Sequence, residues 1–471
     1  MTQLRPNILY IMSDDHSAQA MSCYSGRINQ TPNIDRIARE GMRFERCFCT
    51  NSICAPSRAV ILTGKHSHLN GVRTLGDTMD GRQPTFPKML QKAGYQTAIV
   101  GKWHLGHGGV CDPAGFNYSE VLPGQGVYRN PTFIHAGGKR SIEGYVTDII
   151  TDLSIEWIRK RDKTRPFCLL CHHKAPHSPW EPDEKHAHMY EEERIPEPEN
   201  LQDDYKNRAN AIRSAQCHLD RRLVESFKNW GKANPPDELD RRALREWMYQ
   251  AYVKDYLRCV ASIDDNVGRL LELLDEERIA EDTVVIYTSD QGMFVGEHGM
   301  FDKRFMYEES LRMPFVVRNP REIEGGSVCE QMALNLDFAP TLLDLAGVAI
   351  PPDMQGRSLR PFLRGETPTG WRTSMYYRYW MHMAHLGVYA HYGVRTERHK
   401  LIYYYAEALD ATGAIDDPRP PEWELFDLEK DPMEMNSVYD DPSYGGIVRE
   451  LKAELARLRN EAQDERTPWK D

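Results

Sequence analysis

Apolar runs and amphipathic segments alternate along the first three-quarters of the chain. Strand-like runs cover residues 7–13 ("NILYIMS"), 95–101 ("YQTAIVG"), 166–173 ("PFCLLCHH") and 282–292 ("DTVVIYTSDQG"). Helical spacing covers residues 31–41, 86–94, 145–161 and 252–274, the last within a long, charged, helical span over 200–277. Strands that alternate with helices predict an α/β fold, with a large, mostly parallel sheet between layers of helices.

Beyond about residue 366 the pattern changes. Three short runs rich in tyrosine and β-branched residues, at 374–380, 391–405 and 423–432, predict a small antiparallel sheet, and a helix is expected from about residue 446. The acidic, proline-bearing segment 407–423 reads as an exposed loop. We therefore expect a main domain over residues 1–366 and a C-terminal subdomain over residues 367–471.

The segment 51–66, "NSICAPSRAVILTGKH", predicts a short helix with reactive residues at its start. Pro56 suits a first helical turn, and Gly64 suits the end of the helix. Cys54 then lies at the positive end of the helix dipole, close to Arg58, where an anion or a negatively charged reactive group is favoured. The alternative is a half-buried structural cysteine, and the local pattern leaves both readings open.

Polar residues follow four of the predicted strands. In α/β folds, ligands bind at the carboxyl ends of parallel strands, so these residues are expected to converge. Carboxylate and amide oxygens suit a hard cation such as Ca²⁺ or Mg²⁺, and arginine and lysine around a cation suit a tetrahedral oxyanion. The residues concerned are Asp14, Asp15, Asp290 and Gln291 for the cation, and Arg58, Lys102, His104, His177 and Lys303 around it.

Composition narrows the class of protein. The 471 residues have an ordinary hydrophobic content of 40%, and their net charge of −11 argues against a general nucleic-acid binder. No stretch approaches a membrane span and the N-terminus does not resemble a signal peptide, so no membrane partner and a cytoplasmic location are expected. The ten cysteines are scattered, and the pair Cys168 and Cys171 has no second pair with which to bind zinc.

Several motifs occur together and in one order along the chain. These are "DD" at 14–15, "CAPSR" at 54–58 followed by "AVILTGKH", "GKWHLG" at 101–106, "APHSP" at 175–179, "DQG" at 290–292 and "GEHGMFDKRFMYEESLRMPF" at 296–315. In these motifs the chain resembles the type I, formylglycine-dependent sulfatases, which have the alkaline-phosphatase-like fold. The resemblance implies sulfate-ester hydrolysis by the domain at 1–366.

The resemblance also assigns roles to residues. It implies that a formylglycine-generating enzyme reads the signature and oxidises Cys54 to an aldehyde, whose hydrate attacks sulfate and then releases it. It implies a Ca²⁺ site, with Mg²⁺ as the alternative, formed by Asp14, Asp15, modified Cys54, Asp290 and Gln291; the family usually has asparagine at the last position. The implied catalytic roles are contacts to formylglycine and sulfate for Arg58 and Lys102, proton transfer for Asp290 and His104, and stabilisation of the leaving group for His177 and Lys303.

The class of substrate is indicated by resemblance alone. Segments 254–271, 301–312 and 391–405 are similar to bacterial glycan sulfatases of the N-acetylglucosamine-6-sulfatase and iduronate-2-sulfatase-like groups, which implies a sulfated sugar or small glycan. A phosphonate or phosphate monoester hydrolase of the same fold, and an inactive glycan-binding protein, are the alternatives. The sequence leaves the oligomeric state open. The candidate sugar contacts, taken from the aromatic and polar segment 376–395, are His382, His385, His391 and Arg395.

Overall fold

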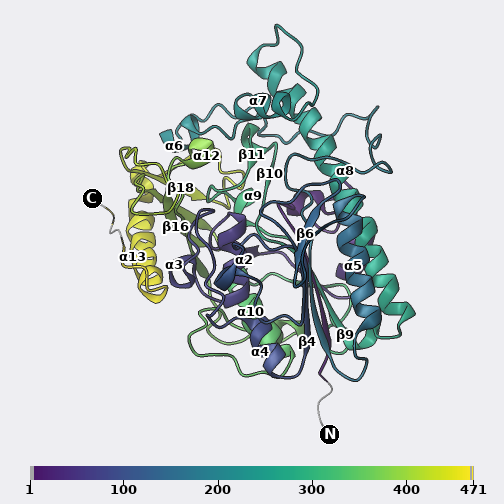
Figure 1. Ribbon diagram of the computed structural model, residues 1–471. Coiled ribbons are helices and arrows are strands. Elements are labelled where there is room, and N and C mark those ends of the chain that lie inside the picture. The colour runs from purple at the N-terminus through teal and green to yellow at the C-terminus, as the bar shows by residue number, and fades with distance from the viewer. Residues whose placement is uncertain (1–4, 467–468, 470–471) are drawn as a thin grey trace.

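The computed structural model describes residues 5–466 and residue 469. Within these residues, ten strands form one twisted sheet (Figure 1). Five central strands, β9, β1, β8, β4 and β5, are parallel, and antiparallel strands flank them. The prediction of a large, mostly parallel sheet is confirmed. In spatial order the strands are β13 (Ser327–Cys329), β2 (Met42–Phe44), β12 (Phe315–Arg318), β9 (Thr283–Ser289), β1 (Asn7–Ser13), β8 (Phe167–His172), β4 (Gln96–Lys102), β5 (Tyr118–Leu122), β6 (Thr132–His135) and β7 (Gly138–Ser141).

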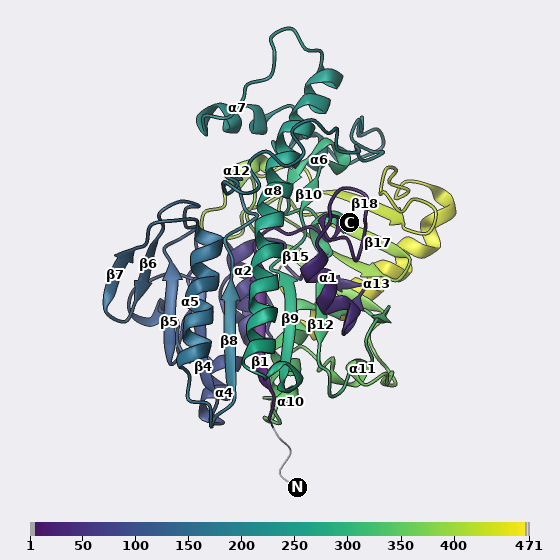
Figure 2. The same ribbon diagram turned by 90° about the vertical axis from the view of Figure 1, so that its right-hand side faces the viewer.

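Helices cover both faces of the sheet (Figures 1 and 2). On one face, α1 (Pro32–Arg39) and α5 (Val146–Lys160) contact the central strands, and α8 (Arg241–Glu276) packs along both helices. On the other face lie α2 (Cys54–Thr63), α4 (Phe86–Lys92) and α10 (Phe338–Leu345). Strands β1, β8 and β9 are almost wholly buried because both of their faces are covered, which explains their continuous apolar sequences.

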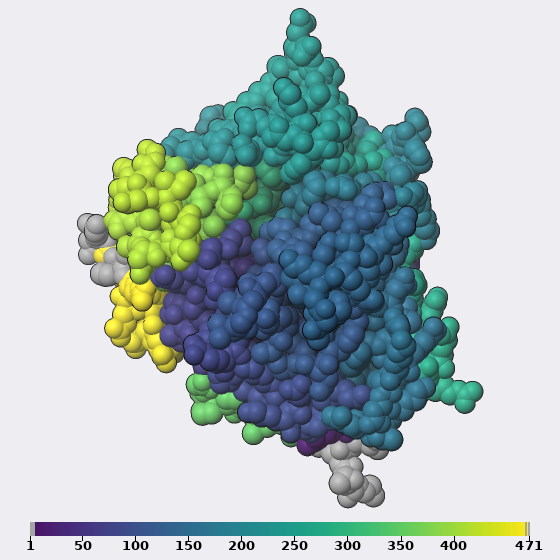
Figure 3. Space-filling model, in the orientation of Figure 1, coloured from purple at the N-terminus to yellow at the C-terminus, as the bar shows by residue number. Residues whose placement is uncertain are grey.

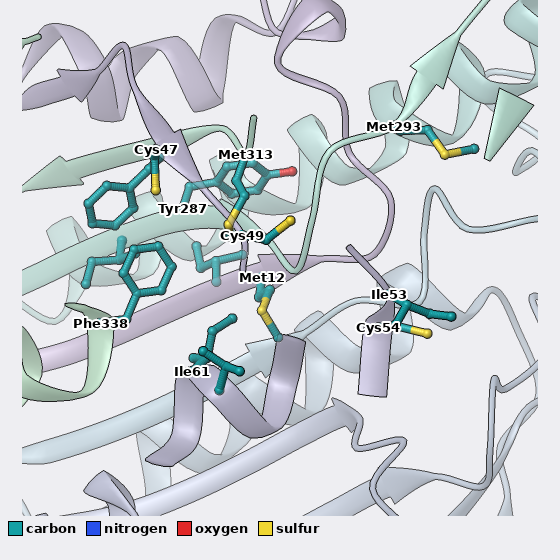
Figure 4. Close-up of a cluster of buried hydrophobic side chains, with 14 of the residues drawn as sticks. Met12, Cys47, Cys49, Ile53, Cys54, Ile61, Tyr287, Met293, Met313 and Phe338 are labelled. Atoms are coloured by element: carbon teal, nitrogen blue, oxygen red, sulfur yellow. The ribbon is translucent and has the colours of Figure 1, made fainter. Parts of the chain in front are cut away.

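Helix α2 lies entirely in the interior, and every one of its ten residues is buried. Its apolar side chains join the core between the layers: Figure 4 shows Ile61 in one cluster with Met12 of β1 and Phe338 of α10, while Cys54 lies at the N-terminal end of the helix. Gly64 ends the helix with a φ of 64°, a left-handed conformation that favours glycine. The predicted helix is thus confirmed, and the rigid core fixes its first turn.

The C-terminal strands form a separate antiparallel sheet, as predicted, in the part of the chain that is described. Its strands are β15 (Ser374–Tyr379), β16 (His391–Thr396), β17 (His399–Tyr404) and β18 (Glu422–Asp427). Alternate residues face opposite sides: Tyr376 packs towards helix α13 (Gly445–Glu461), whereas Tyr377 joins the main core. The run 391–405 is a hairpin of two strands rather than one. The domain boundary at 366/367 stays a prediction.

The expectation of a continuous helical span over 200–277 is wrong for its first part. Only α6 (Asn210–Ser214) and α7 (Arg222–Asn229) interrupt loops before α8 begins. The segment "WGKANPPDELD" at 230–240 explains the break, because glycine and two prolines end α7 and the Asp240 side chain caps α8 by accepting from Ala243 N–H. Figure 3 shows the region around α7 projecting at the top of the molecule.

Short elements complete the described structure, and no helix within it is both long and apolar enough to cross a membrane. Cys168 and Cys171 lie buried within β8. Besides short 3-10 helices, the remaining elements are α3 (Ser67–Asn70), α9 (Glu308–Leu311), α11 (Arg360–Leu363), α12 (Ala384–Gly387), the parallel pair β3 (Cys47–Phe48) and β14 (Ala333–Leu334), and the antiparallel pair β10 (Phe294–Val295) and β11 (Phe301–Asp302).

Candidate active site

The carboxyl ends of neighbouring parallel strands bring the predicted polar residues together. Asp14 and Asp15 follow β1, and Asp290 follows the adjacent β9. Lys102 ends β4, and His177 lies in the loop after β8. The strand order β9-β1-β8-β4 places these ends side by side, and the contacts given below confirm the predicted convergence.

Arg58 connects the carboxylates beneath the site. Its guanidinium donates from Nε to Asp290 Oδ2 at 2.9 Å, from Nη2 to Asp14 Oδ2 at 3.1 Å and from Nη1 to the carbonyl oxygen of Lys102 at 2.9 Å. Only 2% of Arg58 is exposed, because the buried helix α2 carries it. The three bonds fix strands β1, β4 and β9 relative to one another, and removal of one partner from such a buried pair is costly.

Two lysines lie against the aspartates. Lys102 Nζ contacts Asp14 Oδ2, and Lys303 Nζ lies 2.6 Å from Asp15 Oδ1. Burial alone would lower the pKa of Lys303, but the carboxylates of Asp15 and Asp302 outweigh it and raise the pKa. Lys303 therefore stays charged, as a group that stabilises an anion must.

Cys54 opens α2 and faces an amide side chain. Gln125, in the loop after β5, places Nε2 4.0 Å from Cys54 Sγ and accepts a hydrogen bond from Lys102 Nζ through Oε1. Burial raises the pKa of the Cys54 thiol, despite the nearby Lys102. The unmodified thiol is therefore neutral and a poor nucleophile, although it lies where a nucleophile is expected.

The oxygen-rich cluster suits a hard divalent cation. Asp14 Oδ1 and Gln291 Oε1 are buried and have no hydrogen-bond partner among the described residues. Asp15 N–H donates to Asp290 Oδ1 at 3.3 Å, so the third carboxylate adjoins the first two. Burial, together with the charge of Asp14, raises the pKa of Asp290 to about 7. A cation bound by these residues would relieve the crowding of like charges, and the donor set fits Ca²⁺ or Mg²⁺.

Two histidines complete the polar cluster. His177 Nδ1 lies 2.9 Å from the carbonyl oxygen of Ser178, which assigns the proton of the neutral ring to Nδ1, and Nε2 lies 3.8 Å from Asp15 Oδ2. Burial and the charge of Lys102 hold the pKa values of His177 and His104 well below the usual range. Both rings are therefore neutral in the free site and can accept a proton once an anion is bound.

A cavity of about 260 Å³ opens onto this cluster. Its lining includes the buried Cys54 and Lys303 and the half-buried His177, together with exposed residues of the α7 region and of α12. The other side chains that line it are Ile53, Leu75, Gln125, Ser178, Arg222, Ser226, Trp230, Phe301, Asp302, Arg304, His385 and Leu386. Its volume suits a small ligand, and its polar lining suits a hydrophilic one.

An acid–base pair occupies one wall of the cavity on either side of Lys303. Arg304 Nε donates to Asp302 Oδ1 at 2.7 Å, and Arg304 Nη1 donates to the Tyr379 hydroxyl at 3.2 Å. Asp302 and Arg304 both have positive φ, at 73° and 89°. Such backbone conformations are costly for residues other than glycine and cluster at functional sites. The Asp302 carboxylate can accept a hydrogen bond from one hydroxyl of a ligand, while the Arg304 guanidinium beside it donates to the next.

Comparison with known proteins identifies the family. The sequence pattern described as "Sulfatase" matches residues 6–348, and the pattern "N-sulphoglucosamine sulphohydrolase, C-terminal" matches residues 296–461. The chain belongs to the sulfatase family. This sulfatase is 42% identical over 502 residues to the N-acetylglucosamine-6-O-sulfatase of Bacteroides thetaiotaomicron, an alignment that covers 98% of this chain and 87% of the relative. It is accordingly a sulfuric ester hydrolase.

Solved structures agree with this assignment. A structure in complex with its substrate, D-glucosamine-2-N,6-O-disulfate, superposes with a TM-score of 0.90 at 42% identity and covers 98% of this sulfatase and 99% of that chain. The phosphonate monoester hydrolase of Agrobacterium radiobacter gives a TM-score of 0.71 at 20% identity, with 97% and 96% of the chains covered. The second likeness shows a shared fold alone. The alkaline-phosphatase-like architecture expected from the sequence is confirmed.

Of the four candidate sugar contacts, the structure places one in the cavity and three outside it. His385 lines the cavity of the sulfatase, but the other three lie elsewhere, buried and with protein partners. His382 Nε2 donates to the carbonyl oxygen of Asp417 at 2.9 Å, and the ring of His391 stacks against that of Phe305. Arg395 makes a bidentate pair with Glu308 at 3.0 and 3.1 Å. These three side chains therefore stabilise the small sheet and its contact with the main domain.

The structure adds residues that the sequence reading missed. Gln125 lies in a glycine-flanked loop, "PGQGV", after a strand that was not recognised. Asp302 and Arg304 stand in the quoted motif "FDKR", where Lys303 alone was singled out. The outer wall, with Arg222 and Trp230, comes from the segment that was read as continuous helix. Two signals in the sequence could have pointed to these residues. Gln125 follows a strand, and Asp302 and Arg304 flank Lys303.

Proposed function

We propose that this sulfatase removes the 6-O-sulfate from a sulfated glucosamine and releases inorganic sulfate. One observation carries the proposal: Cys54, His177 and Lys303 share a single small cavity with the Asp302–Arg304 pair. Anion chemistry at one end and hydroxyl recognition on the adjoining wall suit a sulfated monosaccharide. The 42% identical relatives, one named for N-acetylglucosamine-6-O-sulfate and one solved with a glucosamine disulfate, support the choice of sugar.

The proposal includes a modified Cys54 and a bound cation. Formylglycine made from Cys54 by a maturing enzyme would supply a hydrated aldehyde as the nucleophile, and a cation would supply positive charge against the sulfate oxygens. Support comes from the neutral thiol of the unmodified residue, which is unsuited to attack, and from the unpartnered buried oxygens of the cluster. Asp14, Asp15, Asp290 and Gln291 would hold the cation, Ca²⁺ by preference and Mg²⁺ as the alternative.

The protein's own side chains position and stabilise the reacting groups. Arg58 orients Asp290 and Asp14, and Lys102 places a positive charge beside Gln125, next to residue 54. Preorganised donors of this kind are effective because they need no rearrangement when charge develops on the sulfate oxygens. Asp290 is suited to accept the proton of the nucleophile at a carboxylate oxygen, and His104 to accept a proton during sulfate release.

The leaving-group side is formed by Lys303 and His177. An incoming sulfate ester brings negative charge towards His177 Nε2, which favours protonation of that atom. A protonated His177 can then donate to the departing sugar oxygen, and Lys303 stabilises the same oxygen electrostatically. Asp302 and Arg304, on either side of Lys303 in the chain, would orient the ring by hydrogen bonds to neighbouring hydroxyls.

Sulfate release from defined sugars tests the proposed function. N-acetylglucosamine-6-sulfate should be hydrolysed, whereas the 3-O-sulfated isomer and glucosamine-6-phosphate should react far more slowly. Cys54→Ala should abolish release, and a peptide mass spectrum should show the aldehyde in place of the thiol in wild-type protein from its native host. Faster hydrolysis of the phosphate ester, or sulfate release at the wild-type rate by Cys54→Ala, would overturn the proposal.

A further inference from the structure

Helix α7 forms the outer wall of the cavity and presents one face to it. Arg222, Ser226 and Trp230 all line the cavity, and they follow one another at intervals of four residues. Residues with this spacing lie on the same side of a helix, and Trp230 directly follows its last turn. In Figures 1 and 3 the α7 region lies at the top of the molecule, above the main domain. The α7 face is thus placed to contact the part of a ligand that lies away from Cys54.

The cations of the cavity differ in how they are neutralised. Lys303 lies 4.0 Å from Asp302 and Arg304 lies 2.7 Å from it, so each has a carboxylate that lines the cavity. Arg222 pairs instead with Glu225, at 2.9 Å, and the Glu225 side chain is 68% exposed and does not line the cavity. Among the described residues that line the cavity, Arg222 is therefore the cation whose ion pair lies outside it. Such surface pairs contribute little and exchange readily for a better partner.

The neighbours of Arg222 complete a site for an anionic sugar substituent. The Ser226 hydroxyl is a second donor, and Trp230, 37% exposed, offers an apolar surface for the carbons of a sugar ring. Trp230 is held by an edge-to-face contact with Trp180, whose ring centroid lies 5.5 Å away. The ring of His385, which also lines the cavity, adds no charge to this wall, because burial lowers its pKa.

We propose that Arg222, Ser226 and Trp230 form a subsite for a second anionic group of the sugar, such as a sulfate on the amino nitrogen, while the scissile sulfate lies at Cys54. This inference rests on the proposed function and adds to it a preference for doubly sulfated glucosamine. It agrees with the disulfated substrate of the 42% identical solved relative. Charge-assisted hydrogen bonds from a guanidinium to sulfate oxygens provide the recognition.

Kinetics with paired substrates test the subsite. For Arg222→Gln, the KM for glucosamine-2-N,6-O-disulfate should rise about tenfold with kcat nearly unchanged, as loss of one charge-assisted contact requires. The KM for N-acetylglucosamine-6-sulfate should stay within about twofold, since that substrate lacks the second charge. Arg222→Lys should restore part of the loss. Arg242→Gln, which removes an exposed arginine of α8 paired with Glu246, is the matched control and should change neither substrate.

Binding of a sugar without the 6-O-sulfate separates this inference from the proposed function. By calorimetry, glucosamine-2-N-sulfate should bind wild type more tightly than N-acetylglucosamine, and Arg222→Gln should remove the difference. Equal binding of the two sugars by wild type, or equal KM changes for both sulfated substrates in Arg222→Gln, would overturn the subsite. Absence of sulfate release from either substrate by modified wild-type enzyme would overturn the proposed function, whatever the binding result.

Discussion

Replacement of Gln125 should impair catalysis without unfolding the protein. Gln125 joins two functional groups, because its Oε1 accepts from Lys102 Nζ while its Nε2 lies 4.0 Å from Cys54 Sγ. The Gln125→Ala change removes both contacts and leaves Lys102 held by Asp14 alone. Gln125→Glu keeps the acceptor for Lys102 but replaces the amide donor by a negative charge. The two variants therefore separate the positioning of Lys102 from donation towards the reacting group.

The expected fall in kcat/KM follows from the two contacts that Gln125 makes. A hydrogen bond to a charged group contributes about 1.5–3 kcal/mol, and loss of one donor aimed at a developing oxyanion costs about 10²–10³ in kcat. Because Asp14 still holds Lys102 in Gln125→Ala, we expect a fall in kcat/KM of about 10², near 3 kcal/mol in activation free energy. Gln125→Glu should fall further, by about 10³, since a carboxylate repels the sulfate oxygens. Gln125 is half-buried in a loop, so the free energy of unfolding should change by less than about 1 kcal/mol.

Initial rates on N-acetylglucosamine-6-sulfate measure the effect, normalised to the aldehyde content of each preparation. Gln83→Ala is the matched control: Gln83 is a half-buried glutamine in another loop, and its Nε2 donates to the carbonyl oxygen of Asn70 at 2.9 Å, outside the cavity. A kcat/KM for Gln125→Ala within about twofold of wild type, at equal aldehyde content, would refute the reasoning.

Three further predictions follow from the site and its support. Asp302→Ala should raise the KM for the sulfated sugar about tenfold while a small aryl sulfate, which lacks the hydroxyls, is affected little; equal effects on both would contradict sugar recognition by this pair. Treatment with a chelator should lower both activity and Tm, and Ca²⁺ or Mg²⁺ should restore them; an enzyme unaffected by exhaustive chelation would not need the cation. Burial lowers the pKa of His391 to about 4, so the folded state binds fewer protons than the unfolded one and stability falls as pH drops through 6.5 towards 4. Proton linkage puts the loss in free energy of unfolding at about 2 kcal/mol between pH 8 and pH 5. In urea unfolding, the His391→Phe variant should lack this loss. If wild type and His391→Phe lost stability equally as pH falls, His391 would not be its source.

The convergence of the polar site residues was predictable because the order of the parallel strands fixes which strand ends lie side by side. Asp14, Lys102, His177 and Asp290 each come at or after the end of a buried strand, and parallel strands end at one edge of a sheet. The buried helix after Cys54 was predictable for a similar reason, since the proline at its start and Gly64 at its end delimit an apolar run. Both are local patterns whose consequence for the fold is fixed by the regular geometry of sheets and helices.

The walls of the cavity could not be predicted in this way. Gln125 and Arg222 lie in a loop and on a short helix, and their approach to Cys54 depends on distant chain segments. His391 shows the converse problem, because a histidine among tyrosines suggests a sugar site, whereas here the ring packs against Phe305, Tyr377 and Tyr404 inside the sheet interface. Sequence pattern indicates that such residues are aromatic or polar but not which side of the small sheet they face.

The complete burial of α2 has a consequence for the order of events during synthesis. Cys54 is 1% exposed and its whole helix lies in the core, so a second enzyme has no access to the signature once the chain has folded. The maturing enzyme proposed above would therefore have to meet this segment while it is still extended, before β1 and β9 enclose it. Folding and the proposed maturation would then compete for the same interval. A preparation that folds faster than it is modified would contain stable, correctly shaped and permanently inactive molecules.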